Sequence, residues 1–370
     1  MYADDFLAAK LQKRQQQQAL RSLYVPNAPM VDFCSNDYLG IAHANLLAMA
    51  EHAGSGSTGS RLLAGNSALA EATEQIIASF HDSEASLLFN SGYDANVGLL
   101  SCVPQRGDVV LYDALAHASI RDGIQLSLAK AYSFAHNNME QLVAKIQQVQ
   151  RQPYQHLFIV TESVFSMDGD ACPIEALVDI CQTYGAHLIV DEAHATGIIG
   201  KLGEGLVQAK GLHHQVFARV HTFGKACGCH GAAITGSKRL QQYLINFARS
   251  FIYSTALSPH AVNTIQASYR IFPQLHQQRR HLEQLIAHFQ QSTLPFYKLP
   301  SQTPIQIVVI PGNDAVKKMA QTLQQAGLDV RPILSPTVPA GSERLRIVLH
   351  AYNTNAQLSQ LIHLLQKQTL

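Results

Sequence analysis

The sequence is poor in charged residues and has no excess of either sign. Of its 370 residues, 14% are Asp, Glu, Lys or Arg, and 27 Lys and Arg face 26 Asp and Glu. A typical soluble domain carries about 25%. A nearly neutral chain lacks the basic surface that binds a phosphate backbone, so we expect no nucleic-acid partner. The low charge leaves two explanations open: a surface of neutral polar side chains, or a large surface hidden in an interface.

The sequence also lacks the segments that would place it in a membrane. It has no apolar run of about 18 residues, the length needed to span a bilayer, and its first ten residues contain two acids and no apolar signal core. Its six cysteines are scattered through the chain, which fits reduced thiols better than a disulfide framework. We therefore expect a soluble, cytoplasmic protein with no membrane partner.

From about residue 65, helix-like and strand-like segments alternate. Short apolar runs, such as 85–90, 156–161 and 185–190, are separated by amphipathic segments. Apolar strands of this kind indicate an α/β fold with a mainly parallel central sheet and helices on both faces. A long helical stretch over 238–266 leads into a smaller α+β unit. We predict three segments: an N-terminal helical segment at 1–36, a large domain at 37–260 and a small C-terminal domain at 261–370.

Polar residues follow three of the expected strands, at the positions where an open parallel sheet binds its ligands. After the first strand, Gly92 and Tyr93 begin a helix whose N–H groups can face an anion, although a simple N-cap explains the same residues. Asp191 and His194 follow the second strand. Lys225 follows the third among apolar neighbours, where desolvation favours a nucleophilic amine.

Two other interpretations of these residues can be tested on the sequence. The run at 191–194 also occurs in helicases, but those need a Gly-Lys-Ser/Thr phosphate loop, and the glycine-rich run at 54–61 lacks the lysine. A metal site would need further ligands; His117 and His221 are candidates, but no compact metal spacing appears, so we expect no metal. One kind of ligand would satisfy all of these residues. It would have a phosphate for Gly92 and Tyr93, a ring nitrogen for Asp191, a ring oxygen for His194 and an aldehyde for Lys225. The set therefore indicates pyridoxal 5′-phosphate.

Nine motifs, in their order and spacing, resemble those of the α-oxoamine synthases. These are fold-type-I pyridoxal-phosphate enzymes that condense an amino acid with an acyl thioester and release CO₂. The motifs are the runs at 35–40, 59–66, 90–93, 117–119, 165–170, 190–194, 222–225, 253–255 and 336–339. The resemblance spans nearly the whole chain and implies a large pyridoxal-phosphate-binding domain. Three of the runs are most similar to the branch that joins L-alanine to a pimeloyl thioester in biotin biosynthesis.

The resemblance implies which residues hold the cofactor. In chain order they are Gly92, Tyr93, His117, Ser166, Asp191, His194, Thr222, Lys225, Ser254 and Thr255. Lys225 would bind the aldehyde and act as the base, Asp191 would keep the ring nitrogen protonated, and His117 would stack on the ring. With His194, which would bond the ring oxygen, these residues form the implied catalytic set.

The resemblance also implies a partner subunit and a substrate site. Ser254 and Thr255 would reach the phosphate across a homodimer with a shared active site, and an obligate interface would account for the low charge. Arg346 would clamp the carboxylate of the amino acid through a bidentate fork. The acyl thioester would be carried by coenzyme A or an acyl carrier protein. Three further residues would line the substrate side: Arg21, Asn36 and Thr337.

One position departs from the family pattern. Leu334 stands where the alanine-using branch often carries an arginine, and Arg331 lies nearby but out of register. The acyl chain, its carrier and the choice among alanine, glycine and serine therefore stay open. A fold-type-I aminotransferase or amino-acid lyase would share the cofactor residues, and a non-catalytic subunit is a third possibility. Retention of Lys225 argues against the last.

Overall fold

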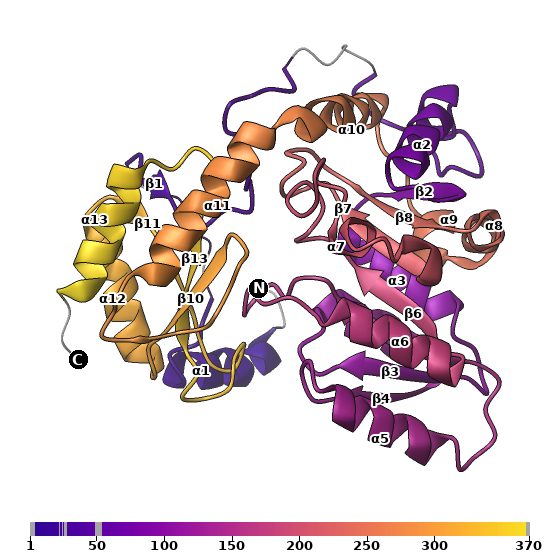
Figure 1. Ribbon diagram of the computed structural model, residues 1–370, viewed down its shortest axis with the longest axis horizontal. Coiled ribbons are helices and arrows are strands. Elements are labelled where there is room, and N and C mark those ends of the chain that lie inside the picture. The colour runs from indigo at the N-terminus through magenta and orange to yellow at the C-terminus, as the bar shows by residue number, and fades with distance from the viewer. Residues whose placement is uncertain (1–3, 22, 24, 26–27, 49–53, 368–370) are drawn as a thin grey trace. The chain divides into compact units, whose positions relative to one another are not determined.

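The computed structural model describes residues 4–21, 23, 25, 28–48 and 54–367. The chain divides into two compact units (Figure 1). Unit 1 draws on residues 1–35, 167–170 and 280–370, and unit 2 on residues 36–166 and 171–279. The expected boundaries after residues 36 and 260 remain predictions.

A seven-stranded sheet lies at the centre of unit 2, and the predicted mainly parallel sheet is confirmed. Its order is β2-β8-β7-β6-β5-β3-β4. The strands from β7 to β4 run parallel, whereas β8 is antiparallel to both β2 and β7. The strands are β2 (Ala85–Phe89), β3 (Val109–Asp113), β4 (Lys130–Phe134), β5 (Leu157–Glu162), β6 (His187–Asp191), β7 (Ala218–Thr222) and β8 (Ala232–Gly236).

Helices connect these strands. They are α2 (Ala68–Phe80), α3 (Gly92–Cys102), α4 (Ala118–Leu126), α5 (Met139–Val149), α6 (Ile174–Tyr184), α7 (Leu206–Ala209), η2 (His213–Gln215), α8 (Lys238–Phe247), α9 (Arg249–Ile252), α10 (Pro259–Ile271) and η3 (Phe272–Gln274). In Figure 1, α5 and α6 lie beside β3, β4 and β6. Because helices cover the sheet, every residue of β2 and β5 is buried, as expected for apolar strands without alternation.

The helical stretch expected over 238–266 is interrupted. It forms α8, α9 and α10, and α10 begins after Ser258, whose side chain caps the N–H of Ala261. Pro259 is the first residue of α10; proline has no N–H and favours an extended residue before it, so it starts a helix but cannot continue one.

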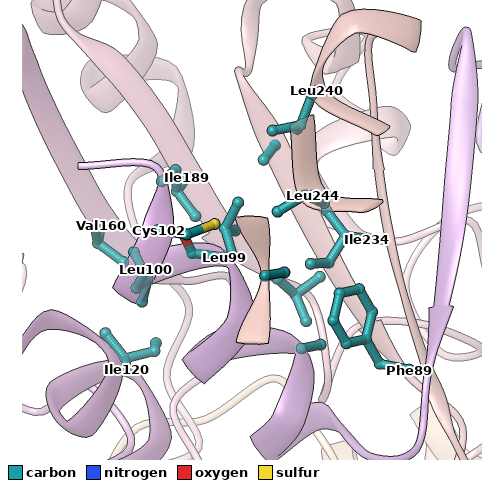
Figure 2. Close-up of a cluster of buried hydrophobic side chains, with 14 of the residues drawn as sticks. Phe89, Leu99, Leu100, Cys102, Ile120, Val160, Ile189, Ile234, Leu240 and Leu244 are labelled. Carbon is teal, nitrogen blue, oxygen red and sulfur yellow. The ribbon is translucent and has the colours of Figure 1, made fainter. Parts of the chain in front are cut away.

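The core of unit 2 joins α3 to the sheet. Leu99 and Leu100 of α3 are fully buried and pack with Phe89 of β2, Ile189 of β6 and Leu244 of α8 (Figure 2). This packing holds the start of α3 at the carboxyl end of the strands, where the predicted site lies.

Unit 1 contains an antiparallel sheet of order β12-β13-β10-β9 and a two-stranded parallel pair, β1 with β11. The smaller α+β unit predicted near the C-terminus is confirmed. Helix α11 carries the chain from unit 2 into unit 1. The elements are η1 (Asp5–Leu7), α1 (Ala8–Gln16), β1 (Val31–Asp32), α11 (His276–Gln291), β9 (Tyr297–Lys298), β10 (Ile305–Val309), α12 (Asn313–Gln325), β11 (Leu328–Asp329), β12 (Arg331–Ile333), β13 (Arg344–Val348) and α13 (Asn355–Gln366). Among the described residues, no helix has the length and apolar character to cross a membrane.

Candidate active site

Four neighbouring strands of unit 2 end in polar residues. These are Asp113 on β3, Glu162 on β5, Asp191 on β6 and Thr222 on β7. Because parallel strands end at the same edge of a sheet, their last side chains lie close together. Asp191 and Thr222 are predicted site residues, whereas Glu162 was not predicted.

Asp191 is buried and held by two hydrogen bonds. One carboxylate oxygen accepts the N–H of Ala193 at 2.9 Å, and the other accepts a bond from Asn96 Nδ2 at 2.7 Å. Asn96 lies on α3 and is 2% exposed. A buried carboxylate fixed in this way can face a protonated ring nitrogen without moving.

His117 is the N-cap of α4, and Ser119, a residue of the same turn, orients its ring. Nδ1 accepts the N–H of Ser119 at 3.2 Å and lies 2.8 Å from Ser119 Oγ. Its main-chain N–H donates to Glu162 Oε1 at 2.6 Å. Desolvation lowers the pKa of His117, the carboxylate of Asp191 raises it and the cation of Lys225 lowers it. The net effect lowers the pKa of His117, which favours the neutral ring, and two further predicted catalytic residues, Asp191 and Lys225, lie within electrostatic range of it.

His194 is buried and bonded to a tyrosine. Its Nδ1 lies 2.6 Å from the hydroxyl of Tyr38, which is itself fully buried and lies 3.1 Å from Asn36 Oδ1. The predicted cofactor residue His194 and the predicted substrate residue Asn36 are thus joined through Tyr38, which the motif at 35–40 contained without a role of its own.

The start of α3 provides an anion site. Ser91 caps the helix by accepting the N–H of Asp94 at 3.1 Å. A methyl group at Gly92 would lie 2.3 Å from Thr222 Oγ1, so the backbone at Gly92 and the hydroxyl of Thr222 are in close approach. N–H groups at a helix N-terminus together with a hydroxyl suit a phosphate group.

Tyr93 contributes its backbone to this turn rather than its ring. The ring is exposed, and its hydroxyl bonds to Asp122 on α4, which raises the pKa of Tyr93.

Asn90 Nδ2 donates to the carbonyl of Thr255 at 2.9 Å. The segment that carries Ser254 and Thr255 is therefore tied, within one chain, to the loop before α3. Both residues line a cavity of about 190 Å³.

Lys225 lies in a turn directly after β7 and is half-buried. Its carbonyl accepts the N–H of Gly228 at 2.8 Å. The neighbouring Phe223, Ala226 and Cys227 are fully buried, as the apolar context predicted. Ser166 is half-buried at the end of one segment of unit 2. The buried carboxylate, the neutral histidine, the anion site and this lysine fit pyridoxal phosphate.

Three of the predicted substrate residues belong to unit 1. Arg21 donates to Thr337 Oγ1 at 3.2 Å. Arg346 is buried on β13, opposite Ile307 of β10. Leu334 is half-buried, and its carbonyl accepts the N–H of Thr337 at 2.8 Å.

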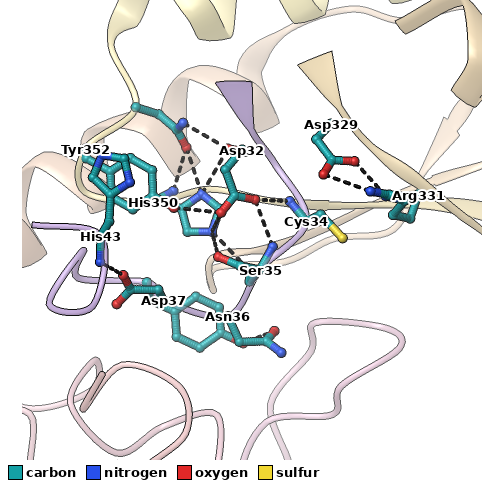
Figure 3. A network of polar contacts seen from close by, with 12 residues as sticks. Asp32, Cys34, Ser35, Asn36, Asp37, His43, Asp329, Arg331, His350 and Tyr352 are labelled. Atoms are coloured by element: carbon teal, nitrogen blue, oxygen red, sulfur yellow. Dashed lines mark hydrogen bonds and ion pairs between the residues drawn. The ribbon is translucent and has the colours of Figure 1, made fainter. Parts of the chain in front are cut away.

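The charge of Arg331 is paired with Asp329, so this residue does not replace the arginine that the family often carries at position 334. Its Nε lies 2.6 Å from Asp329 Oδ1 (Figure 3). In the same view, Asp32 Oδ1 accepts the N–H groups of Cys34 and Ser35 at 2.8 and 2.9 Å. Burial opposes the charge of Asp32, but His350 and these hydrogen bonds outweigh it and lower the pKa of Asp32 to about 2. The carboxylate thereby fixes the chain where the motif at 35–40 begins.

Two residues of the site, Glu162 and Asn96, were not predicted from the sequence, for different reasons. Glu162 ends β5 as Asp191 ends β6, so an acid after an apolar run was a usable signal. Asn96 lies inside α3, and no local pattern marks it as a partner of Asp191.

One cluster among the described residues has the composition of a metal site. Ligand atoms of Asp82, His213 and His214 lie within 4.8 Å of one another. The side chains of Asp82 and His214 are 64% and 70% exposed, and both histidines form ion pairs with Asp82.

His221, considered as a metal ligand in the sequence analysis, is fully buried and stacked on His81 with ring centroids 3.7 Å apart. Hydroxyl groups of two threonines, Thr196 and Thr235, occupy both of its ring nitrogens.

Comparisons with known proteins show the family of this chain. Residues 28–365 match the family model for aminotransferase class I and II. The chain is 40% identical to an 8-amino-7-oxononanoate synthase of Emericella nidulans, over 97% of this chain and 94% of that protein. A serine palmitoyltransferase of S. paucimobilis with a bound PLP–myriocin aldimine has a TM-score of 0.86 and 28% identity, over 98% of this chain and 96% of that one. An 8-amino-7-oxononanoate synthase of Francisella tularensis has a TM-score of 0.73 and 26% identity, over 91% and 97%.

Proposed function

Because the chain belongs to the aminotransferase class I and II family and is a pyridoxal-phosphate-dependent acyltransferase, we propose that it catalyses the 8-amino-7-oxononanoate synthase reaction. In this reaction L-alanine condenses with a pimeloyl thioester, with loss of CO₂, in biotin biosynthesis. The observation that carries the proposal is that Asp191 ends β6, Lys225 follows the neighbouring parallel strand β7, and His117 bonds to the residue that ends β5, so all three lie at one edge of the sheet. The similarity to enzymes named for this reaction supports the choice of substrates.

Each residue of the site has a task in this chemistry. When bound, pyridoxal phosphate supplies a protonated ring that accepts the electron pair left on the amino acid. Asp191, held by Asn96 and Ala193, keeps the ring nitrogen protonated. The neutral ring of His117 packs on the cofactor ring. Lys225 takes the α-proton as a free amine and later returns a proton to the product.

The remaining predicted residues bind and orient the ligands. The N–H groups at Gly92 and Tyr93 and the hydroxyl of Thr222 hold the phosphate. His194, fixed by Tyr38, bonds the ring oxygen together with Ser166. The substrate side is formed by Arg21, Asn36, Thr337 and Arg346.

We also propose a homodimer in which Ser254 and Thr255 complete the phosphate site of the partner. Such a dimer stays associated at micromolar concentration, because obligate interfaces bury thousands of Å². Sedimentation velocity would show one species of twice the chain mass, and a monomer would contradict the shared site.

A second candidate is an α-oxoamine synthase for another acyl chain. Leu334 replaces the family arginine, and the charge of Arg331 is paired with Asp329. An apolar side chain at this position favours an acyl chain without a distal carboxylate, since a buried carboxylate needs a cation.

One assay separates these functions. Purified protein is given alanine, glycine or serine with pimeloyl, acetyl or palmitoyl thioesters, and thiol release is followed. Alanine with the pimeloyl thioester is expected to release thiol fastest. Release with palmitoyl thioester alone would favour the second candidate, and transamination without thiol release would contradict both. Lys225→Ala should abolish release, whereas the exposed Lys201→Ala should leave it unchanged.

A further inference from the structure

Glu162 is a buried carboxyl group at the site that has no task in the chemistry above. It is 3% exposed and ends β5. Its Cα partner on the neighbouring parallel strand is Asp191, and paired residues on parallel strands direct their side chains to the same face. Two carboxyl groups therefore share one edge of the sheet.

Glu162 begins a chain of polar contacts that passes through His117 and ends at Asp191. Glu162 Oε1 accepts the main-chain N–H of His117 at 2.6 Å, and His117 Nδ1 lies 2.8 Å from Ser119 Oγ. Asn96 Nδ2 donates to Ser119 Oγ at 3.0 Å and to Asp191 Oδ2 at 2.7 Å. Glu162 thus holds the main chain of His117, and Ser119 holds its ring.

The electrostatics of this edge favour an uncharged Glu162. Burial, Asp191 and Asp113 raise the pKa of Glu162, the His117 N–H and Lys225 lower it, and the net result is a pKa of about 8. Asp113 is itself paired with His136 at 3.0 Å. An uncharged Glu162 leaves the negative charge on Asp191, and its carbonyl oxygen still accepts the His117 N–H.

We propose that Glu162 is a positioning residue that acts through His117: it holds the main chain at the N-cap of α4 and so sets the plane in which the His117 ring meets the cofactor. This inference rests on the proposed function only for the ring contact of His117, not for the choice of substrates. Removal of Glu162 leaves a main-chain donor without its partner and allows the N-cap to move, although Ser119 still holds the ring.

A double-mutant cycle tests whether Glu162 acts through His117. The affinity of the apoprotein for pyridoxal phosphate is measured by fluorescence quenching for Glu162→Ala, His117→Ala and the double variant. Glu162→Ala should weaken binding roughly 10-fold, within the range of coupling between residues in contact, because the N-cap that fixes the plane of the His117 ring is released. In the His117→Ala background it should change binding by less than about 2-fold. Equal losses in both backgrounds would overturn the proposal.

Conservative variants and a matched control separate positioning from folding. Glu162→Gln keeps an acceptor oxygen at the same reach and should bind like the wild type, whereas the shorter Glu162→Asp should bind like Glu162→Ala. If Glu162→Ala does not fold, the Gln and Asp pair carries the test. Glu192 is also a buried glutamate and accepts the N–H of Val207 at 3.0 Å. Glu192→Ala should lower the thermal midpoint without coupling to His117, and coupling of similar size would overturn the proposal.

The two proposals fail in different ways. A wild-type apoprotein that never binds pyridoxal phosphate would contradict the proposed function. Normal cofactor binding with the wrong thioester would contradict only the substrate choice. Wild-type binding in both Glu162→Ala and Glu162→Asp would contradict the positioning role alone.

Discussion

Gly92→Ala tests whether the anion site depends on the close approach of α3 and β7. The added methyl would lie 2.3 Å from Thr222 Oγ1 and 3.4 Å from both Thr222 Cβ and Cγ2. Forcing a methyl group into such a contact costs about 1–3 kcal/mol. Alanine returns up to about 1 kcal/mol as a better helix former than glycine. We therefore expect a net loss of about 1–2 kcal/mol in the free energy of unfolding.

The Thr222→Ala background should reverse the sign of this effect. Without Oγ1 and Cγ2, the nearest atom of residue 222 is Cβ at 3.4 Å, which is close to an ordinary contact. Only the helix preference then remains, so Gly92→Ala should be neutral or stabilising by up to about 1 kcal/mol.

Urea unfolding of the apoprotein at one fixed protein concentration measures these differences, because subunit association would otherwise add to the stability. Gly224→Ala is a matched control, since its methyl would meet nothing closer than Cys229 O at 3.7 Å. Equal destabilisation by Gly92→Ala in both backgrounds would refute the close-approach argument.

Three further predictions concern stability. Leu99→Ala, at a fully buried position of α3, should lower the free energy of unfolding by about 3–4 kcal/mol in urea. Because the pKa of Glu162 is raised from 4.5 to about 8, stability should fall as pH rises across that window, by at most about 1.4 kcal/mol per unit; Glu162→Gln should flatten this part of the profile, and an unchanged slope would contradict the assignment. Burial lowers the pKa of His81 and His221 well below 6.5, so the unfolded chain takes up protons first and stability should fall as pH drops below about 6.5; thermal midpoints of His221→Gln should show a smaller fall than those of the wild type.

The sheet and most of the candidate site were predictable because their signals are local. An apolar run followed by a polar residue predicts a buried parallel strand and marks its carboxyl end, and Asp191, Thr222 and Lys225 each come directly after such a run. The helical stretch at 238–266 was predicted only in outline. Its interruption before Pro259 has a local signal, the Ser258 cap and the proline that follows it, which the prediction over 238–266 did not use.

The sequence by itself determined the fold class and the cofactor and marked the residues proposed to bind it, because strand ends and motif order are properties of the chain. Only the tertiary structure decided which side chains support them. Asn96 reaches Asp191 across 95 positions, Glu162 holds His117 across 45, and Tyr38 bonds His194 across 156. A hydrogen bond between residues so far apart depends on distances of a few ångströms set by packing, and no spacing in one sequence records them.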